Sequence, residues 1–371
     1  MAQQGAPPPE LINDAIGEIL LRIPPDSSAY LARASMVCKL WRRIVSDPDF
    51  TRRYREFHRT PPLLGFLYNS EGLPLFFPTR AACPFPQPAV GYSHWWTLDF
   101  RRLWADDCRH GRVLLRHLDT GKIFVSDPFT GDREELPNPH IDHMFGSSMV
   151  ICAVAGCNHC NCLGGPFHVV FVGSYAGWVH GCVYSSEARA WGTPVSVFMG
   201  RDWFVDLKRG VLVGDEAYFT LRSGVRILKY QLEKNCLSAI DPPDGYGWNV
   251  VIVPTDEGSL GFAGIKSSNL YLWSRKVDPN GLAGWVQYRV IELERLLPDN
   301  ISCNRADVIG FAEGVNVMFV KIIATTFMIE LKSGKVRKLT EFGHFSTVLP
   351  FMSFNTPGST NSILPLSVDK N

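Results

Sequence analysis

The spacing of apolar residues divides the chain into two regions. Between residues 10 and 59, apolar residues recur every three or four positions, which is typical of one face of a helix. Pro24-Pro25 ends the first helix, and Asp26 or Ser27 can cap a second one that runs on to Val45. A short turn of helix follows at 50–54. The pattern predicts a small all-α module of three helices, which buries too little surface to be robust alone.

From residue 62 to 355, short apolar runs of strand length alternate with Gly-rich turns. Groups of three or four such runs recur every 40 to 50 residues, at 110–137, 148–194, 210–241, 250–293 and 307–340. This repeat predicts a β-propeller, because single blades stack around an axis to bury their faces. We expect the flanking pieces 63–79 and 346–354 to share one further blade. Six blades are favoured, five or seven fit as well, and a β-sandwich or two smaller barrels are the alternatives.

The two regions meet at Pro61-Pro62, where two prolines stop helix formation. We therefore expect a disordered N-terminus at 1–9, the helical domain at 10–59, the propeller at 60–356 and a disordered tail at 357–371. The predicted fold is mainly β, with a small helical domain that precedes the propeller in the sequence.

Composition argues against several classes of function. The chain has 37 basic and 36 acidic residues, whereas nucleic-acid-binding domains usually carry a basic excess. A basic cluster at 42–59 reads as a solvated helical face, since 1–60 has a net charge of only +2, from nine basic and seven acidic residues. No run of apolar residues is long enough to span a membrane, and the first residues do not resemble a secretory signal. We expect the cytoplasm and/or the nucleus, with reduced cysteines.

The sequence contains none of the common catalytic motifs. GxSxG, HExxH and GxxxxGK[ST] are all absent, so we predict a non-enzymatic protein without a cofactor. An enzyme with a site in the propeller channel remains an alternative, because a triad of dispersed residues is recognised only by geometry. The loops at 80–91, 138–148, 156–166 and 241–249 are candidates for binding another protein.

A cysteine-rich stretch has part of the spacing of a metal site. Cys157 and Cys160 are separated by two residues, and Cys162, His159, Cys152 and His168 lie nearby. No second CxxC motif accompanies them, and Cys152 falls in an apolar run where a thiol acts as a small hydrophobe. We therefore predict an ordinary loop with no metal. Zinc, with Cys157, Cys160, Cys162 and His159 as candidate ligands, is the alternative, and a disulfide would form only on oxidation.

Two segments in the helical region resemble the F-box, whose consensus sequence is EILxRLPP followed by VCKxWRxLxxDPxF. They read Glu18-Ile19-Leu20-Leu21-Arg22-Ile23-Pro24-Pro25 and Val37-Cys38-Lys39-Leu40-Trp41-Arg42-Arg43-Ile44-Val45-Ser46-Asp47-Pro48-Asp49-Phe50. The usual Leu-Pro opening is replaced by Leu11-Ile12, which weakens or shifts the first contact of the motif. The rest of the chain is similar to plant F-box families, grass members in particular, at residues 60–66, 108–115, 127–131, 183–187 and 331–334.

The resemblance implies a substrate receptor of an SCF-type cullin–RING ubiquitin ligase. In that family the F-box binds a Skp-type adaptor, the adaptor binds cullin, and the C-terminal domain holds a target protein, here unknown. The adaptor contacts carried over from the motif are Leu11, Ile12, Ile16, Ile19, Leu20, Ile23, Pro24, Val37, Cys38, Trp41 and Ile44, of which about half must instead form the core of the module. An interaction protein without ubiquitin coupling is the second alternative.

Overall fold

The computed structural model describes residues 13–25, 28–70, 72–79, 102–128, 132–159, 162, 164–222, 226–247, 250–297, 303–340 and 345–354. The chain divides into two compact units, one of Met1–Pro62 with Ser353–Asn371 and the other of Leu63–Met352. The termini for which we predicted disorder, 1–9 and 357–371, lie outside the described residues. No helix in the described ranges is long and apolar enough to cross a membrane.

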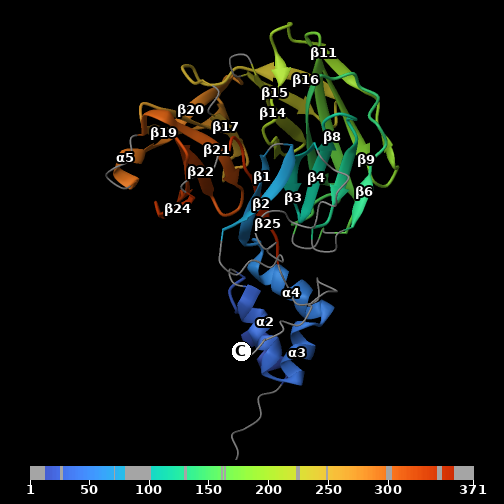
Figure 1. Ribbon diagram of the computed structural model, residues 1–371, viewed down its shortest axis with the longest axis vertical. Helices are drawn as coiled ribbons and strands as arrows, with labels where there is room; N and C mark the ends of the chain where they lie inside the picture. Colours follow the sequence, from blue (N-terminus) through green and yellow to red (C-terminus); the bar gives the residue numbers. More distant parts are fainter. Residues whose placement is uncertain are drawn as a thin grey trace, which may run out of the picture. The chain divides into compact units, whose positions relative to one another are not determined.

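Four helices form the described part of the first unit: α1 (Asn13–Leu21), α2 (Ser28–Val37), α3 (Lys39–Val45) and α4 (Pro48–His58) (Figure 1). The sequence predicted three, with α2 and α3 continuous. The helix breaks at Cys38, whose backbone is extended (φ −159°, ψ 167°) and whose Sγ accepts a hydrogen bond from the Trp41 N–H at 3.5 Å. Cys38 thus acts as the N-cap of α3. Asp47 caps α4 in the ordinary way, with Pro48 in its first turn.

The core of the helical unit is small. It consists of Ile16, Leu20, Leu21, Leu31, Ala34, Val45, Phe50, Tyr54 and Phe354. The Tyr54 hydroxyl donates a hydrogen bond to the carbonyl oxygen of Ile23 at 2.7 Å, and the Phe354 ring meets the Tyr54 ring edge-on. The sequence predicts that the propeller ends at residue 356; in the structure, Ser353 and Phe354 belong to the helical unit.

The second unit is a propeller of six antiparallel sheets (Figure 1). Blade 1 contains β1 (Leu63–Ser70), β2 (Leu73–Pro78) and β25 (Leu349–Met352), and blade 2 contains β3 (Leu103–Arg109), β4 (Arg112–His117), β5 (Ile123–Ser126) and β6 (Arg133–Glu135). Blade 3 contains β7 (Phe145–Cys152), β8 (Phe167–Tyr175), β9 (Trp178–Ser185), β10 (Ala190–Trp191) and β11 (Val195–Phe198). Blade 4 contains β12 (Phe204–Val205), β13 (Val211–Val213), β14 (Glu216–Arg222), β15 (Arg226–Gln231) and β16 (Cys236–Ile240).

The last two blades are regular four-stranded sheets. Blade 5 contains β17 (Val250–Pro254), β18 (Leu260–Lys266), β19 (Asn269–Val277) and β20 (Ala283–Glu292). A short helix α5 (Leu293–Leu296) and a 3₁₀ turn (Cys303–Arg305) lead to blade 6, which contains β21 (Ala306–Ala312), β22 (Val317–Ile322), β23 (Thr325–Glu330) and β24 (Val336–Thr340). The predicted groups 250–293 and 307–340 are therefore one blade each.

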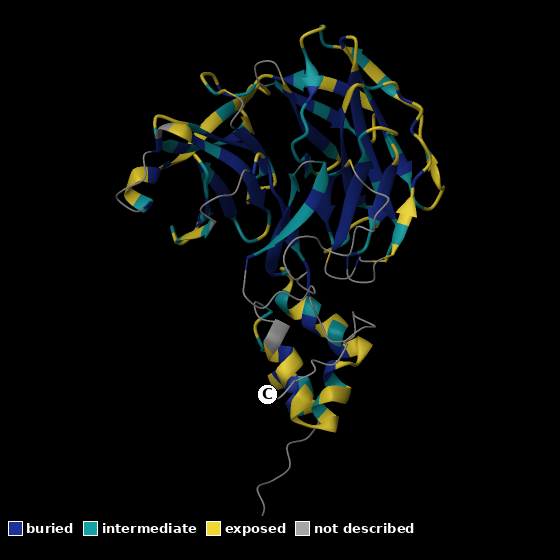
Figure 2. Ribbon diagram, viewed as in Figure 1, coloured by how far each residue is buried: buried dark blue, intermediate teal, exposed yellow. Residues whose placement is uncertain are grey.

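The ring closes in blade 1. The last strand, β25, pairs antiparallel with β1, with Leu349 opposite Leu67, and β1 pairs in turn with β2. Strands from the two ends of the propeller thus share one sheet, which confirms the predicted composite blade and the six-bladed arrangement. Buried strands follow one another around the centre of the ring (Figure 2).

Candidate functional sites

The helical unit exposes several large apolar side chains. Five of them lie on α1, α2 and α3, and we refer to them together as the α1–α3 apolar surface: Ile19, Tyr30, Met36, Val37 and Leu40. Ile19 is 52% exposed, Met36 75% and Val37 64%. Single exposed apolar residues are common, but several on one small module indicate a binding surface for another protein.

The structure divides the predicted adaptor contacts between surface and core. Ile16 and Leu20 lie in the core of the helical unit, and the Leu20 side chain has no exposed area. Four of the predicted residues are exposed, namely Ile19, Pro24, Val37 and Cys38. Three more are half-buried and pack against the core, namely Ile23, Trp41 and Ile44. Leu11 and Ile12 lie outside the described residues.

Tyr30, Met36 and Leu40 are surface candidates that the sequence pattern did not predict. The pattern predicted one continuous helix with a single apolar face, whereas the helix breaks at Cys38. A signal was present nonetheless. Tyr30 and Met36 are large apolar residues next to the core-facing stripe of Leu31 and Ala34, and a helix that is apolar on more than one side packs against more than one neighbour.

The basic cluster of the helical unit is partly neutralised within the unit. The Arg52 guanidinium lies 3.2 Å from carboxylate oxygens of Asp49 and of Glu56, and Arg53 lies 2.5 Å from Glu18. These pairs are exposed and contribute little to stability. Their arrangement fits the solvated helical face that the sequence predicts.

A buried ionic network lies inside the propeller, centred on Asp107 of β3. The Asp107 carboxylate, which is fully buried, accepts hydrogen bonds from Arg109 Nε at 3.1 Å, Arg209 Nε at 2.9 Å and the Val150 backbone N–H at 3.1 Å. Glu313 lies 3.2 Å from the guanidinium nitrogens of both arginines. The network joins residues of blades 2, 3 and 4 and the turn after β21 in blade 6.

The charged groups of this network keep one another ionised. Burial by itself would lower the pKa of Arg209, but the negative charges of Glu313 and Asp107 outweigh it and raise that pKa. A second buried pair lies beside it, with Arg116 Nε 2.9 Å from Asp106 and the Ser148 hydroxyl donating to the same carboxylate. Because these groups neutralise and hydrogen-bond one another, they are well suited to fixing blades and poorly suited to acid–base chemistry.

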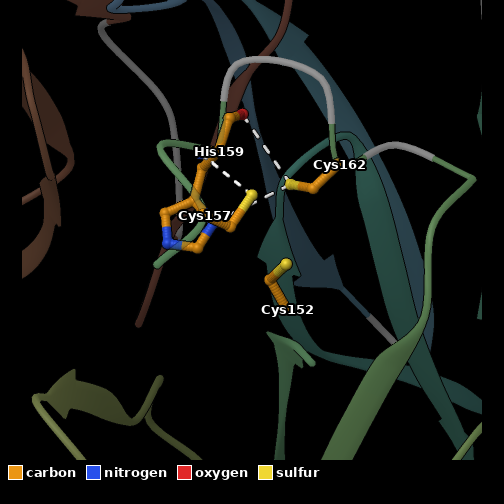
Figure 3. A group of neighbouring side chains, drawn as sticks. All are labelled: Cys152, Cys157, His159 and Cys162. Carbon is orange, nitrogen blue, oxygen red and sulfur yellow. Dashed lines mark hydrogen bonds between the residues drawn. The ribbon is translucent and has the colours of Figure 1, made fainter. Parts of the chain in front are cut away.

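The cysteine-rich stretch folds into a compact group of ligand-type atoms. Cys152 ends β7, and Cys157, His159 and Cys162 lie in the following loop, 153–166. One ligand atom from each of the four lies within 4.8 Å of all the others (Figure 3). Of the residues considered from the sequence, Cys152, Cys157, His159 and Cys162 belong to the group, His168 is not a member, and Cys160 lies outside the described residues.

Burial governs the protonation of this group. It raises the pKa of the Cys162 thiol to about 12, with further contributions from Cys152 and Cys157. Burial and the charge of Arg109 lower the pKa of His159, so its imidazole is neutral at pH 7. The His110 ring stacks on the His159 ring with centroids 4.3 Å apart, and burial and His159 together lower the pKa of His110 to about 3.

Comparison with known proteins gives one family match and several matches in fold. Residues 9–53 match the F-box domain family. No curated protein matches the chain. Similar folds among solved structures include an extracellular domain from B. thetaiotaomicron (14% identity, TM-score 0.35, over 65% of this chain and 28% of that one) and the allergen Mala s 1 from Malassezia sympodialis (11% identity, TM-score 0.38, over 66% and 79%).

A protein of the mitotic checkpoint complex also matches, at 11% identity and a TM-score of 0.37, over 66% of this chain and 82% of that one. The chain spans less than a third of the length of the B. thetaiotaomicron domain. These likenesses are too weak to support any statement about activity. Residues 9–53 are thus an F-box domain, and a six-bladed β-propeller follows it.

Proposed function

We propose that the protein is a substrate-recognition subunit of an SCF-type ubiquitin ligase. In this proposal the F-box binds a Skp-type adaptor, the adaptor binds cullin, and the propeller binds the protein to be ubiquitinated. F-box domains in general bind Skp1-type adaptors and act as adaptor subunits rather than enzymes. The observation that carries the proposal is the F-box match at residues 9–53, together with exposed apolar residues on the same helices.

The α1–α3 apolar surface has the chemistry that such an interface needs. Ile19, Val37 and Leu40 are apolar side chains that gain most of their binding free energy when a partner removes them from water. They lie outside the core residues Ile16 and Leu20, so binding a partner need not disturb the fold. We propose that the surface residues are the adaptor contacts and that Ile16 and Leu20 support them from beneath.

The propeller supplies a scaffold of sheets joined by surface loops, which is the usual arrangement for recognition of another protein. The buried Asp107 carboxylate contacts Arg209, and Arg209 contacts the partly exposed Glu313, which favours a structural role over catalysis. We propose action in the cytoplasm and/or the nucleus, in line with the resemblance to plant families. An interaction protein without ubiquitin coupling is the second candidate, favoured by Leu11-Ile12 in place of the usual Leu-Pro opening.

Surface variants test this proposal without unfolding the protein. The full chain is co-expressed with a Skp-type adaptor, and the recovered adaptor is measured for wild type, Ile19→Asp and Val37→Asp. Each aspartate places a charge in the proposed apolar interface, and we expect adaptor affinity to fall by about 30-fold, as when a binding hot spot is lost. The matched control is Val277→Asp, an exposed valine in the propeller, which should bind as wild type does. Wild-type binding by both F-box variants would refute the interface.

A further inference from the structure

We propose that Cys152, Cys157, His159 and Cys162 bind a zinc ion, which holds the loop between β7 and β8 in one conformation. The four residues are a set of soft and borderline ligands, three sulfurs and one imidazole nitrogen, of the kind found in structural zinc sites. This site does not depend on the F-box or on ubiquitin coupling.

The positions of the ligand atoms are close to those of a tetrahedral site. Zinc binds sulfur at about 2.3 Å and histidine nitrogen at about 2.0–2.1 Å, so ligand atoms around it stand roughly 3.5–3.8 Å apart. Cys162 Sγ lies 3.8 Å from His159 Nδ1, and all four ligand atoms lie within 4.8 Å of one another. Movements of about 1 Å would complete the coordination, and rotation of side chains supplies movements of that size.

The loop backbone already supports one of the sulfur ligands. The His159 backbone N–H donates a hydrogen bond to Cys157 Sγ at 3.3 Å (Figure 3). Such a donor stabilises a thiolate, and donors around the ligands adjust the affinity of metal sites. His159 itself has a positive φ of 58°, and the Cys157 and Cys162 sulfurs lie within 4.8 Å of each other.

The surroundings balance the charge of a bound ion. Three thiolates and a neutral imidazole around Zn²⁺ carry a single net negative charge. Arg112, a buried residue of β4, interacts electrostatically with Cys162 and Cys152, and its Nη2 donates to the carbonyl oxygen of Gly165 at 2.6 Å. A buried cation beside a metal–thiolate group offsets the cost of burying that group.

All four ligands come from the protein, which is the pattern of a structural site without an open position for substrate. The site would join the end of β7 to the loop 153–166, and the stacking of His110 on His159 would join that loop to the turn between β3 and β4 in blade 2. We therefore expect zinc to stabilise the contact of blades 2 and 3.

Metal analysis of the purified full chain tests the site directly. The chain is co-expressed with the adaptor, purified under reducing conditions without chelator, and analysed by plasma mass spectrometry. We expect about one zinc ion per chain in the wild type, and less than about a tenth of that in Cys157→Ser and in Cys162→Ser. Cys236→Ser, at an exposed cysteine of β16, is the matched control and should keep its zinc.

Cobalt substitution separates a metal site from misfolding of the variants. Wild-type chain loaded with Co²⁺ should show intense visible bands of tetrahedral cobalt and thiolate charge-transfer absorption in the near ultraviolet. A chelator should lower the melting temperature of the wild type but leave that of Cys157→Ser unchanged. A wild-type chain that holds neither zinc nor cobalt while its cysteines are reduced, or zinc that persists in both Cys157→Ser and Cys162→Ser, would overturn the proposal.

Discussion

Removal of the Asp107 carboxylate should destabilise the propeller more than most single substitutions. Asp107→Ala leaves the buried guanidinium groups of Arg109 and Arg209 with one carboxylate, Glu313, which is itself partly exposed. Loss of one partner of a buried ion pair costs about 3–5 kcal/mol, because the remaining charge stays buried without compensation. At about 2–3 °C per kcal/mol for a domain of this size, the melting temperature should fall by about 6–15 °C.

Thermal unfolding followed by tryptophan fluorescence measures this shift. The control is Asp119→Ala, which breaks an exposed pair with Arg102 and should change the melting temperature far less. Asp107→Asn separates charge from volume: it keeps the size of the side chain but loses the charge, and should show at least half of the loss. A melting temperature for Asp107→Ala within about 2 °C of Asp119→Ala would refute the reasoning.

The remaining predictions concern the helical unit and blade 6. Leu20→Asp should unfold the helical unit, seen as loss of helical circular dichroism and of adaptor binding, whereas Ile19→Asp should lose adaptor binding with the circular dichroism unchanged. Gly310→Ala should lower the melting temperature by an amount that corresponds to about 1–3 kcal/mol, because its Cβ would lie 2.8 Å from the backbone oxygen of Val348. Gly284→Ala, with nothing within 4 Å of its Cβ, is the control and should melt close to wild type.

Most of the propeller could be predicted from its apolar runs, because each blade repeats the same alternation of strands and turns. Strand β3 was missed, and the reason is physical. Its sequence carries Asp106 and Asp107 at consecutive positions, which interrupts the apolar run, yet both carboxylates are buried. Asp106 pairs with Arg116 of the next strand, and Asp107 pairs with Arg109 and with Arg209, which is 102 residues further along the chain. The Arg209 partner leaves no local signal in the sequence.

The candidate sites were only partly predictable for related reasons. The F-box sequence motif located the helical unit. The motif alone does not separate core residues from surface residues, and it does not predict the helix break at Cys38. In the cysteine group, the spacing of Cys157 and Cys160 drew attention to the correct loop. Cys152 was noted beside them but interpreted as a strand residue, and its position at the end of β7, next to the loop ligands, comes from the fold.

The most direct test of the proposed function is assembly of the full chain with a Skp-type adaptor and cullin. The mixture is separated by size-exclusion chromatography, with Val37→Asp and Val277→Asp run beside the wild type. We predict that wild type and Val277→Asp elute in one complex with adaptor and cullin, and that Val37→Asp elutes apart from both. A folded wild-type chain that elutes without adaptor and cullin would contradict the proposed role in ubiquitin ligation.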